Sequence, residues 1–427
     1  MNPYSAAASL AGTKDRSLEG LRGLACLGVL LSHFMFSFLP STAHWLTKGG
    51  AGIPQFYDFE SVLRLPVFLV FFNGSFPVSI FDAMSGYVLT KKYFDTNDPD
   101  LLRSGAAKRY PRLVIPALVS MIFAYALLKA GLMCTQLAPD IGSAGWPMDA
   151  YKSPVGVLEV MWEFLSLPFA GTVPINAPLW TIMLELIGSF LMFATYALFG
   201  SRRPVAAAIL FAVLSMLVFR ASFVQVHLLT VFAGSLLHYI KREWLGIPAL
   251  PVVMIVAGMI GGAYDFSPWF DWARIPMPTL PVPLPDLAGK EREVFNALGA
   301  FLLVGGVLGS NAIARGLSCR PFAYLGKISF SLYLLHWPII CSLSFGTMYL
   351  LKVRNGIDYL WAVGVTAIVT MAAVVAGAHL FEILVDRWAI RLAGIFSVYI
   401  LGSHGPRLPR PQDSHVVAGQ AAPAFET

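Results

Sequence analysis

Charged residues are scarce in this chain of 427 residues. Asp, Glu, Lys and Arg together make up 13% of it, against about 25% in a typical soluble domain. Hydrophobic residues make up 57%, and the mean hydropathy is +0.68. A water-soluble fold of this length would carry more charge on its surface, so the composition indicates a protein that lies largely within a lipid bilayer.

Cysteine and the familiar motifs of soluble enzymes are also sparse. The four cysteines form no C-x-x-C pair, which gives no basis for a disulfide framework or a zinc site, and Cys26 and Cys341 lie in apolar runs as small core residues do. There is no P-loop and no H-E-x-x-H motif, and the strings GSN and SGY do not match a nucleophile elbow. We therefore expect no bound metal and no bound cofactor.

Long apolar runs, in contrast, are abundant. Several reach the roughly 20 residues that a helix needs to cross a hydrocarbon core about 30 Å thick, whereas the strands of a membrane barrel show shorter alternating segments. We predict an all-α fold, a polytopic membrane protein with about ten transmembrane helices in one bundle. The predicted spans lie near residues 20–40, 75–91, 112–133, 179–199, 204–220, 223–240, 249–265, 294–311, 327–350 and 359–384.

These spans divide the chain into three parts. We predict a cytosolic N-terminal segment over residues 1–17, a transmembrane domain over 18–390 and a disordered cytosolic tail over 402–427. Within the transmembrane domain, residues 155–169 are apolar but too short for a typical span, and they predict an interfacial or re-entrant helix. The proline-rich residues 275–285 predict an extended loop.

The positive charges set the predicted orientation. A net charge of +6 can indicate a nucleic-acid partner, but in a membrane protein basic loops more simply mark the cytosolic side, and we expect no nucleic acid. Ten spans place both termini on one side, and assigning that side to the cytosol collects most of the 30 Lys and Arg residues. Both termini are therefore predicted to be cytosolic. The pattern fits the endoplasmic reticulum and the plasma membrane equally, and it leaves the oligomeric state open.

Arg22 and His33 lie eleven residues apart in the first apolar stretch. On a helix, eleven steps of about 100° bring both side chains to one face, about 16 Å apart along the axis. An ionisable side chain within a span is costly and is by default a candidate functional residue. The structural alternative is an arginine that reaches to the membrane surface and a histidine that bonds neighbouring helices.

Lys108, Arg109 and Arg112 form a basic run on the same predicted side of the membrane as Arg22. Arg109 and Arg112 are three residues apart, so a helix places them on one face. Guanidinium groups suit bidentate contacts with phosphate, which predicts a site for a phosphorylated co-substrate. Basic residues are expected at a cytosolic loop in any case, and spacing alone favours neither interpretation.

Carboxylates also fall in or near the predicted spans. Glu185 could orient His33, bind a substrate hydroxyl or pair with an arginine, and a purely structural bridge between helices is equally open. For Asp82, substrate contact and pairing with an arginine are both open. Glu382 and Asp386 lie four residues apart near the end of the last span, and we expect them to pair with cytosolic arginines.

A polar stripe runs along the ninth predicted span. Ser329, Tyr333 and His336 are spaced by four and three residues, so a helix aligns them along one face that could line a cavity or form a seam between helices. Pro338 lacks a backbone donor and should kink the helix and expose a carbonyl. At the second span, Asn73 or Ser75 is expected to cap the helix.

Five segments resemble, in order along the chain, the motifs of acyltransferase family 3, the integral-membrane O-acyltransferases. They are SLEGLRGLACLGVLLSHF with Arg22 and His33, SIFDAMSGYVL with Ser85, Gly86 and Tyr87, KRYPRLVIP with Arg109 and Arg112, PLWTIMLELIGSF with Trp180 and Glu185, and LGKISFSLYLLHWPI. The matches run from about residue 16 to 388, and the loop lengths are similar to those of fungal members. Three positions depart from the family pattern: Asp82 stands where an apolar aromatic is usual, Thr181 where serine is, and Glu19 where aspartate is.

The resemblance implies transfer of an acyl group, usually acetyl from acetyl-CoA, to a hydroxyl of a small-molecule, lipid or carbohydrate acceptor, including secondary metabolites. Acyl-CoA would then be a co-substrate, with the bilayer and the hydroxyl-bearing acceptor as the other partners. A neutral His33 suits a general base on the acceptor hydroxyl, and the basic side chains would hold the phosphates of CoA. The expected catalytic residues are His33, Arg22 and Glu185, the expected donor-binding residues are Lys108, Arg109 and Arg112, and the expected substrate-cavity residues are Asp82, Ser85, Tyr333 and His336.

Two other classes remain open at this point. His33, Asp82, Glu185 and His336 would equally suit the proton or solute path of a transporter or channel. A structural or sensory membrane protein that has lost activity is a third possibility, although the intact pair of Arg22 and His33 speaks against it.

Overall fold

The computed structural model describes residues 3–43, 55–143, 150–151, 155–170, 174–219, 221–240, 247, 249–273 and 290–402, with side chains from Arg16 onward. The predicted loop at 275–285 and all but the first residue of the predicted tail at 402–427 lie outside the described residues.

Every element within the described residues is helical. The α-helices are α1 (Pro3–Phe38), α2 (Glu60–Leu63), α3 (Pro66–Leu69), α4 (Ser75–Thr96), α5 (Pro99–Lys129), α6 (Ala138–Ile141), α7 (Val157–Ala170), α8 (Trp180–Phe199), α9 (Pro204–Val218), α10 (Ser222–Leu236), α12 (Ala249–Gly262), α13 (Glu291–Gly309), α14 (Asn311–Leu317), α15 (Arg320–Ile339), α16 (Phe345–Tyr349), α17 (Tyr359–Phe381) and α18 (Arg387–Leu401). Short 3₁₀-helices are η1 (Pro40–Ala43), η2 (Thr135–Leu137), η4 (Pro174–Leu179), η5 (Leu237–Tyr239) and η6 (Pro268–Ala273), and π-helical turns are η7 (Ile340–Ser344), η8 (Leu350–Arg354) and η9 (Glu382–Asp386).

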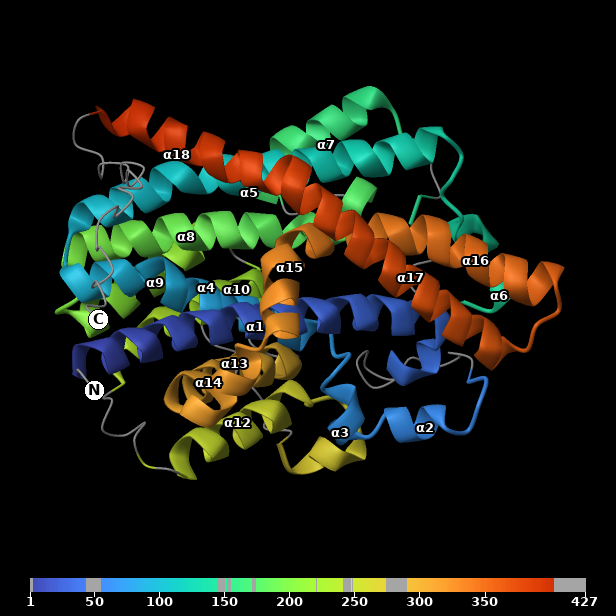
Figure 1. Ribbon diagram of the computed structural model, residues 1–427, viewed down its shortest axis with the longest axis horizontal. Helices are drawn as coiled ribbons and strands as arrows, with labels where there is room; N and C mark the ends of the chain where they lie inside the picture. Colours follow the sequence, from blue (N-terminus) through green and yellow to red (C-terminus); the bar gives the residue numbers. More distant parts are fainter. Residues whose placement is uncertain are drawn as a thin grey trace, which may run out of the picture.

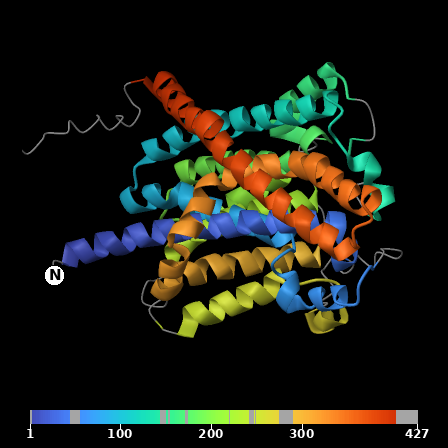
Figure 2. The same ribbon diagram turned by 45° about the vertical axis from the view of Figure 1, so that its right-hand side comes forward.

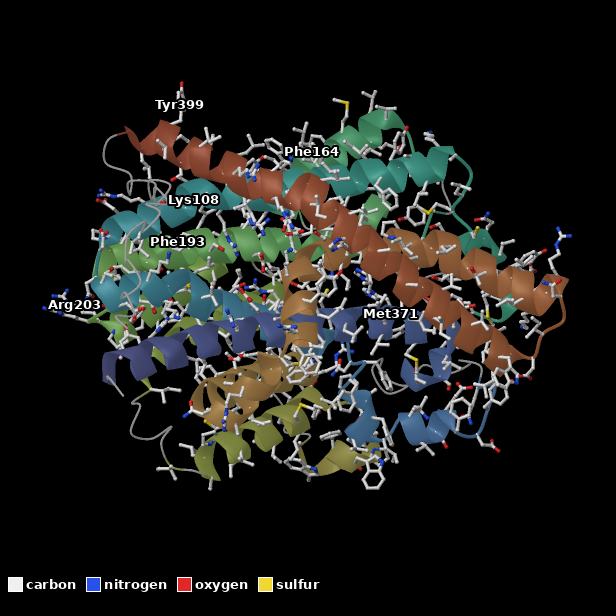
Figure 3. All side chains as sticks on the ribbon, viewed as in Figure 1. Lys108, Phe164, Phe193, Arg203, Met371 and Tyr399 are labelled. Atoms are coloured by element: carbon white, nitrogen blue, oxygen red, sulfur yellow. The ribbon has the colours of Figure 1, made fainter. Side chains whose placement is uncertain are left out.

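The long helices run roughly side by side along the longest axis of the molecule, and α15 lies steeply across α1 (Figure 1). Helices α17 and α18 continue one another through η9 and cross the outer face of the bundle in both views (Figures 1 and 2). The start of α1 and the end of α18 lie at the same end of the bundle, and Arg203 projects from that end (Figure 3).

Six helical segments among the described residues are long and apolar enough to cross a membrane, which makes the protein a multi-pass membrane protein. They are Arg16–Phe38, Pro99–Lys129, Val157–Phe199, Glu291–Gly309, Arg320–Arg354 and Tyr359–Leu401. Three shorter apolar helices cover Pro204–Val218, Phe223–Tyr239 and Ala249–Gly262. The helical class is confirmed, whereas the number of ten spans stays a prediction.

Three helices begin well before the spans predicted for them, and the first is α1, which starts at Pro3 rather than near residue 20. Helix α5 starts at Pro99 rather than near residue 112, and Asp98 caps it by accepting a hydrogen bond from the Asp100 amide at 2.9 Å. Helix α15 starts at Arg320 rather than near residue 327. The extra turns of α5 carry several charged residues, and hydropathy detects only the part of a helix that lies in hydrocarbon.

Small residues bring α1 and α15 into direct backbone contact. A Cβ atom added to Gly23 would lie 2.6 Å from the Gly326 amide nitrogen, and one added to Gly326 would lie 2.1 Å from the Glu19 carbonyl oxygen. Neither distance is sterically possible, so only glycine allows this approach, as is common where helices cross within a membrane. The crossing carries His33 of α1 toward His336 of α15.

A second glycine contact joins α4 and α10. A Cβ atom on Gly86 would lie 1.8 Å from the Val231 carbonyl oxygen, and one on Gly234 would lie 1.9 Å from the Ala83 carbonyl oxygen. The two helices therefore pack backbone against backbone. This contact places Asp82 of α4 against His227 of α10.

Pro338 disturbs α15 as its sequence predicts. Because a proline has no N–H, the Leu334 carbonyl four residues earlier loses its helical donor, and the helix passes into the π turn η7 just beyond. The Asn176 side chain of η4 donates a hydrogen bond to that carbonyl at 2.9 Å. The hydrogen bond from Asn176 to this carbonyl thus connects α15 to the segment that leads into α8, and we call it the tether.

The predicted cap of α4 is wrong. The N-cap position is Gly74, and no side chain caps this helix end. The Asn73 amide instead donates to the Gly262 carbonyl at 2.8 Å and to Asn296 Oδ1 at 3.3 Å. A tertiary contact with α12 and α13 has replaced the local one.

Candidate active site

His33 and His336 form a hydrogen-bonded pair at the crossing of α1 and α15. His33 Nδ1 and His336 Nε2 are 2.7 Å apart, and the two rings are parallel to within 4°. His336 Nδ1 lies 2.7 Å from the Tyr333 carbonyl oxygen, which can only accept, so this nitrogen carries a proton. In a neutral pair His336 Nε2 is then the acceptor and His33 Nδ1 the donor, which leaves the lone pair of His33 on Nε2.

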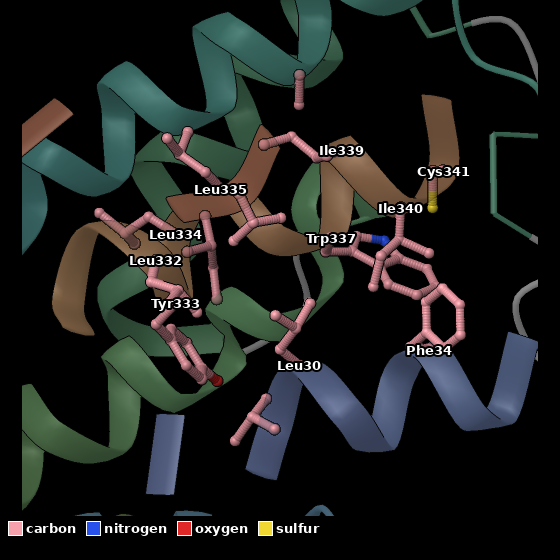
Figure 4. Close-up of a cluster of buried hydrophobic side chains, with 14 of the residues drawn as sticks. Leu30, Phe34, Leu332, Tyr333, Leu334, Leu335, Trp337, Ile339, Ile340 and Cys341 are labelled. Atoms are coloured by element: carbon pink, nitrogen blue, oxygen red, sulfur yellow. The ribbon is translucent and has the colours of Figure 1, made fainter. Parts of the chain in front are cut away.

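Large apolar side chains fix the position of this pair. His336 is fully buried, and the Trp337 ring meets the His33 ring edge-on at 5.4 Å between centroids. Phe34 of α1 and Trp337 of α15 point toward one another in the adjoining core, with Leu30 beside them (Figure 4). Rotation of either imidazole is therefore restricted by close packing.

A cavity of about 230 Å³ lies toward the start of α1, and we call it the arginine cavity. Its polar lining consists mainly of Arg22, Asp82, Ser85, Arg109, Arg112 and Glu185. Arg109 and Arg112 share one face of α5, as their spacing predicts, and both reach the cavity together with Arg22 of α1. Three guanidinium groups thus surround one space inside the bundle.

Two of the three arginines are held by carboxylates. Arg109 donates to Glu185 at 3.3 Å and to the Ser189 hydroxyl at 2.8 Å. Arg112 forms a two-pronged ion pair with Asp386 of η9. Arg22 makes no hydrogen bond or ion pair with the side chains of the described part of the chain, so its charge is the one available to an incoming anion.

Glu185 connects three elements around the arginine cavity. Its carboxylate accepts hydrogen bonds from Ser85 of α4 at 3.1 Å and from Arg109 of α5 at 3.3 Å. Of the roles left open by the sequence, the geometry therefore shows both pairing with an arginine and a bridge between helices. His33 is not among its hydrogen-bond partners within the described residues.

A second cavity of about 250 Å³ adjoins the first, and we call it the histidine cavity. Its lining includes His33, Asn73, Trp180, Phe223, His227 and Tyr333. Tyr333 and Val78 line both cavities and so form part of the partition between them. The Tyr333 hydroxyl is fixed there, because it donates to the Pro178 carbonyl at 2.7 Å and accepts from Thr181 at 2.9 Å.

Asp82 pairs with a histidine rather than an arginine. Its Oδ2 atom lies 2.7 Å from His227 Nδ1, and both residues are 2% exposed. Sequence reasoning missed His227, although an ionisable residue inside a predicted span was a sufficient signal. Asp82 lines the arginine cavity and His227 lines the histidine cavity.

Most of the other predicted site residues gather at these two cavities. Lys108 is not among the lining residues of either cavity, and His336 reaches the site only through His33. At the end of the last span, Asp386 pairs with Arg112, and Glu382 pairs with Arg387 at 2.9 Å. Within the described residues no three His, Cys, Asp or Glu side chains gather as a metal site would require.

The fold and the site define a multi-pass helical membrane protein with a buried histidine pair and two polar cavities inside its bundle. The chain belongs to the acyltransferase family whose model, described as an acyltransferase domain, matches residues 15–382. The prediction of this family is confirmed, and the protein is an acyltransferase.

One curated relative supports the same assignment. The chain is 23% identical over 403 residues to the O-acetyltransferase PaAT-1 of Phomopsis amygdali, an alignment that covers 82% of this chain and 78% of the relative. No solved structure matches the chain.

Proposed function

We propose that this protein transfers an acyl group, most simply acetyl, from acyl-CoA to a hydroxyl group of a small-molecule, lipid or carbohydrate acceptor. The observation that carries the proposal is the chain of contacts from the Tyr333 carbonyl through His336 to His33. It holds the lone pair of His33 on Nε2, as a general base requires. The name of the relative PaAT-1 favours acetyl and oxygen as the transferred group and the acceptor atom.

In the proposed reaction His33 Nε2 takes the proton of the acceptor hydroxyl while the hydroxyl oxygen attacks the thioester carbon. The new C–O bond forms, the C–S bond breaks, and the thiolate of CoA leaves and takes up the proton from His33. His336 fixes the ring of His33 and shares its positive charge while the proton is held. The carboxylate of a serine-protease triad orients its histidine by the same logic.

The arginine cavity is the proposed donor site. Arg22, the guanidinium without a carboxylate partner among the described residues, would bind a phosphate of CoA, with Arg109 and Arg112 adding positive potential. Arg22 and His33 are about 16 Å apart along α1, a length comparable to the extended pantetheine arm. The acyl group would therefore reach the partition near Tyr333 while the phosphates stay at Arg22.

The orientation follows from where acyl-CoA is found. Arg22, Arg109 and Arg112 would face the cytosol, and both termini with them, in keeping with the distribution of Lys and Arg. Either the endoplasmic reticulum or the plasma membrane would present the arginine cavity to cytosolic acyl-CoA. Protease protection of tags at the two termini, in sealed vesicles, tests this orientation.

The direct test compares the wild type with His33→Ala in membranes supplied with radiolabelled acetyl-CoA. The proposal predicts that the variant inserts normally and releases no CoA above background. His379→Ala is the matched control, because His379 lies on α17 outside both cavities and bonds Tyr324 at 3.2 Å. Unchanged turnover in His33→Ala would contradict the mechanism, and solute movement without release of CoA would indicate a transporter.

A further inference from the structure

Two residues that line the histidine cavity each carry a buried polar atom without a hydrogen-bond partner among the described residues. Among the described residues, neither His227 Nε2 nor Asn73 Oδ1 has a hydrogen-bond partner. His227 is 2% exposed and Asn73 1%, and both residues line this cavity together with His33. Buried polar atoms are nearly always hydrogen-bonded, so an unpaired atom beside a cavity calls for an explanation.

A structural role for the pair of Asp82 and His227 does not supply that explanation. The pair joins α4 to α10, but Gly86 and Gly234 already bring these helices into backbone contact. A polar contact with a purely structural role stabilises the fold most when every donor and acceptor in it has a hydrogen-bond partner. Here the His227 imidazole is hydrogen-bonded through Nδ1, whereas Nε2 has no hydrogen-bond partner among the described residues.

The chemistry of the two atoms indicates which ligand group could form hydrogen bonds with them. The Asn73 amide nitrogen donates to the Gly262 carbonyl, so the unpaired Oδ1 is an acceptor and needs a donor. His227 Nε2 is an acceptor or a donor according to how Asp82 and His227 share their protons. A hydroxyl group both donates and accepts, so hydroxyls satisfy both positions in every protonation state of the pair.

The walls of the cavity indicate the rest of the ligand. Trp180 and Phe223 pack edge-on against the His227 ring, with centroids 5.5 and 4.8 Å away, and both line the cavity. Aromatic walls suit the apolar faces of a ring. The volume of about 250 Å³ lies just below the range of about 300–1,000 Å³ for drug-sized ligands, so it accommodates a single ring.

We propose that the histidine cavity binds a ring-bearing polyol, with one hydroxyl at His33 for acylation and a second hydroxyl at His227 and Asn73. This inference rests on the proposed function for the identity of the reacting hydroxyl, and it adds the substrate class and the residues that select it. His227 and Asn73 are positioning residues here, and Asp82 fixes the His227 ring.

The test uses cyclohexanol and the cyclohexanediols as acceptor probes with the detergent-solubilised full-length protein and acetyl-CoA. The wild type should prefer the best diol by about tenfold in kcat/KM, the effect of one hydrogen bond at a buried site. His227→Asn keeps an N–H toward Asp82 but withdraws the outer nitrogen, so the preference should fall to about the statistical factor of two for two hydroxyls. His227→Gln returns a polar group near the outer position and should recover part of the preference.

A matched control is His238→Asn, because His238 follows in η5 after the same helix and lines neither cavity. It should retain the wild-type preference. Equal diol preference in the wild type and in His227→Asn would overturn the inference, and so would a wild type that does not distinguish diol from cyclohexanol.

A binding measurement separates this inference from the proposed function. Without acetyl-CoA, the diol should raise the Tm of the wild type and of His238→Asn but not that of His227→Asn. If this pattern holds while the wild type releases no CoA, the proposed function fails and the polyol site stands. If CoA is released but no diol-dependent rise in Tm occurs, the polyol site fails and acyl transfer stands.

Discussion

Arg22 and His33 lie on the same helix and line different cavities, with Tyr333 in the partition between them. The helix thus places these two ionisable side chains in two separate cavities rather than in one. In the proposed mechanism Arg22 must be positive to bind a phosphate, whereas His33 must be neutral to accept a proton. Separation by a partition lets both states persist about 16 Å apart.

Replacing His336 tests whether it orients the catalytic base. His336→Phe removes the contact with His33, so we expect kcat to fall by about 100-fold, the lower range for loss of general base catalysis, with little change in KM for acetyl-CoA. His336→Gln keeps an acceptor near the position of Nε2 and should lose less. Steady-state kinetics of both variants measure this, and equal losses in the two would contradict an orienting role.

Replacing Arg22 tests the donor site. Arg22→Ala removes the guanidinium that lacks a carboxylate partner in the described part of the chain, so KM for acetyl-CoA should rise by about ten- to 100-fold, in line with about 1.5–3 kcal/mol for a charged hydrogen bond. Acetyl-pantetheine, which lacks the nucleotide phosphates, is the matched donor. Its kinetics should hardly change in Arg22→Ala; an equal rise in KM for both donors would argue against phosphate binding at Arg22.

Asn176 and Pro338 offer a test of the tether between η4 and α15. Asn176→Leu conserves volume but leaves the Leu334 carbonyl buried without a donor, which should lower the free energy of unfolding by about 1–3 kcal/mol. Adding Pro338→Ala restores a backbone N–H to α15, so the double variant should recover part of that loss. Thermal unfolding of the wild type, the two single variants and the double variant in detergent measures this double-mutant cycle. Strictly additive changes in stability would exclude the tether.

Gly326 is predicted to be essential for the crossing of α1 and α15. In Gly326→Ala the new Cβ would meet the Glu19 carbonyl at 2.1 Å, so the helices must separate and the contact between His33 and His336 must lengthen. We expect loss of acyl transfer and a lower Tm. Gly364→Ala is the control, because a Cβ there meets no atom within 4 Å among the described residues; equal activity of the two variants would show that the close crossing is dispensable.

Local features of the structure could be predicted from the sequence because they depend on neighbours along the chain. Hydropathy located most of the long helices but not α18, and spacing placed Arg109 and Arg112 on one face of α5. The missing donor at Pro338 predicted an exposed carbonyl. Helix ends were less certain, because polar turns outside the hydrocarbon carry no hydropathy signal.

Contacts between distant segments could not be predicted in the same way. Asp82 and His227 are 145 residues apart, and their pairing depends on the packing of α4 against α10 through two glycines. Asn176 lies outside the predicted spans, and nothing in its neighbourhood indicated that it bonds the Leu334 carbonyl. The pair of His33 and His336 likewise depends on the angle at which α15 crosses α1, which no residue spacing encodes.

The partition at Tyr333 has a consequence for the membrane itself. Polar cavities inside a bundle hold water, and two that merged into one passage would conduct protons or ions across the bilayer. The Tyr333 ring, whose hydroxyl is hydrogen-bonded to Pro178 and Thr181, lies between the two cavities, where such a passage would form. In the proposed reaction donor and acceptor meet at this side chain, so the same residue would also help to keep the membrane impermeable to protons and ions.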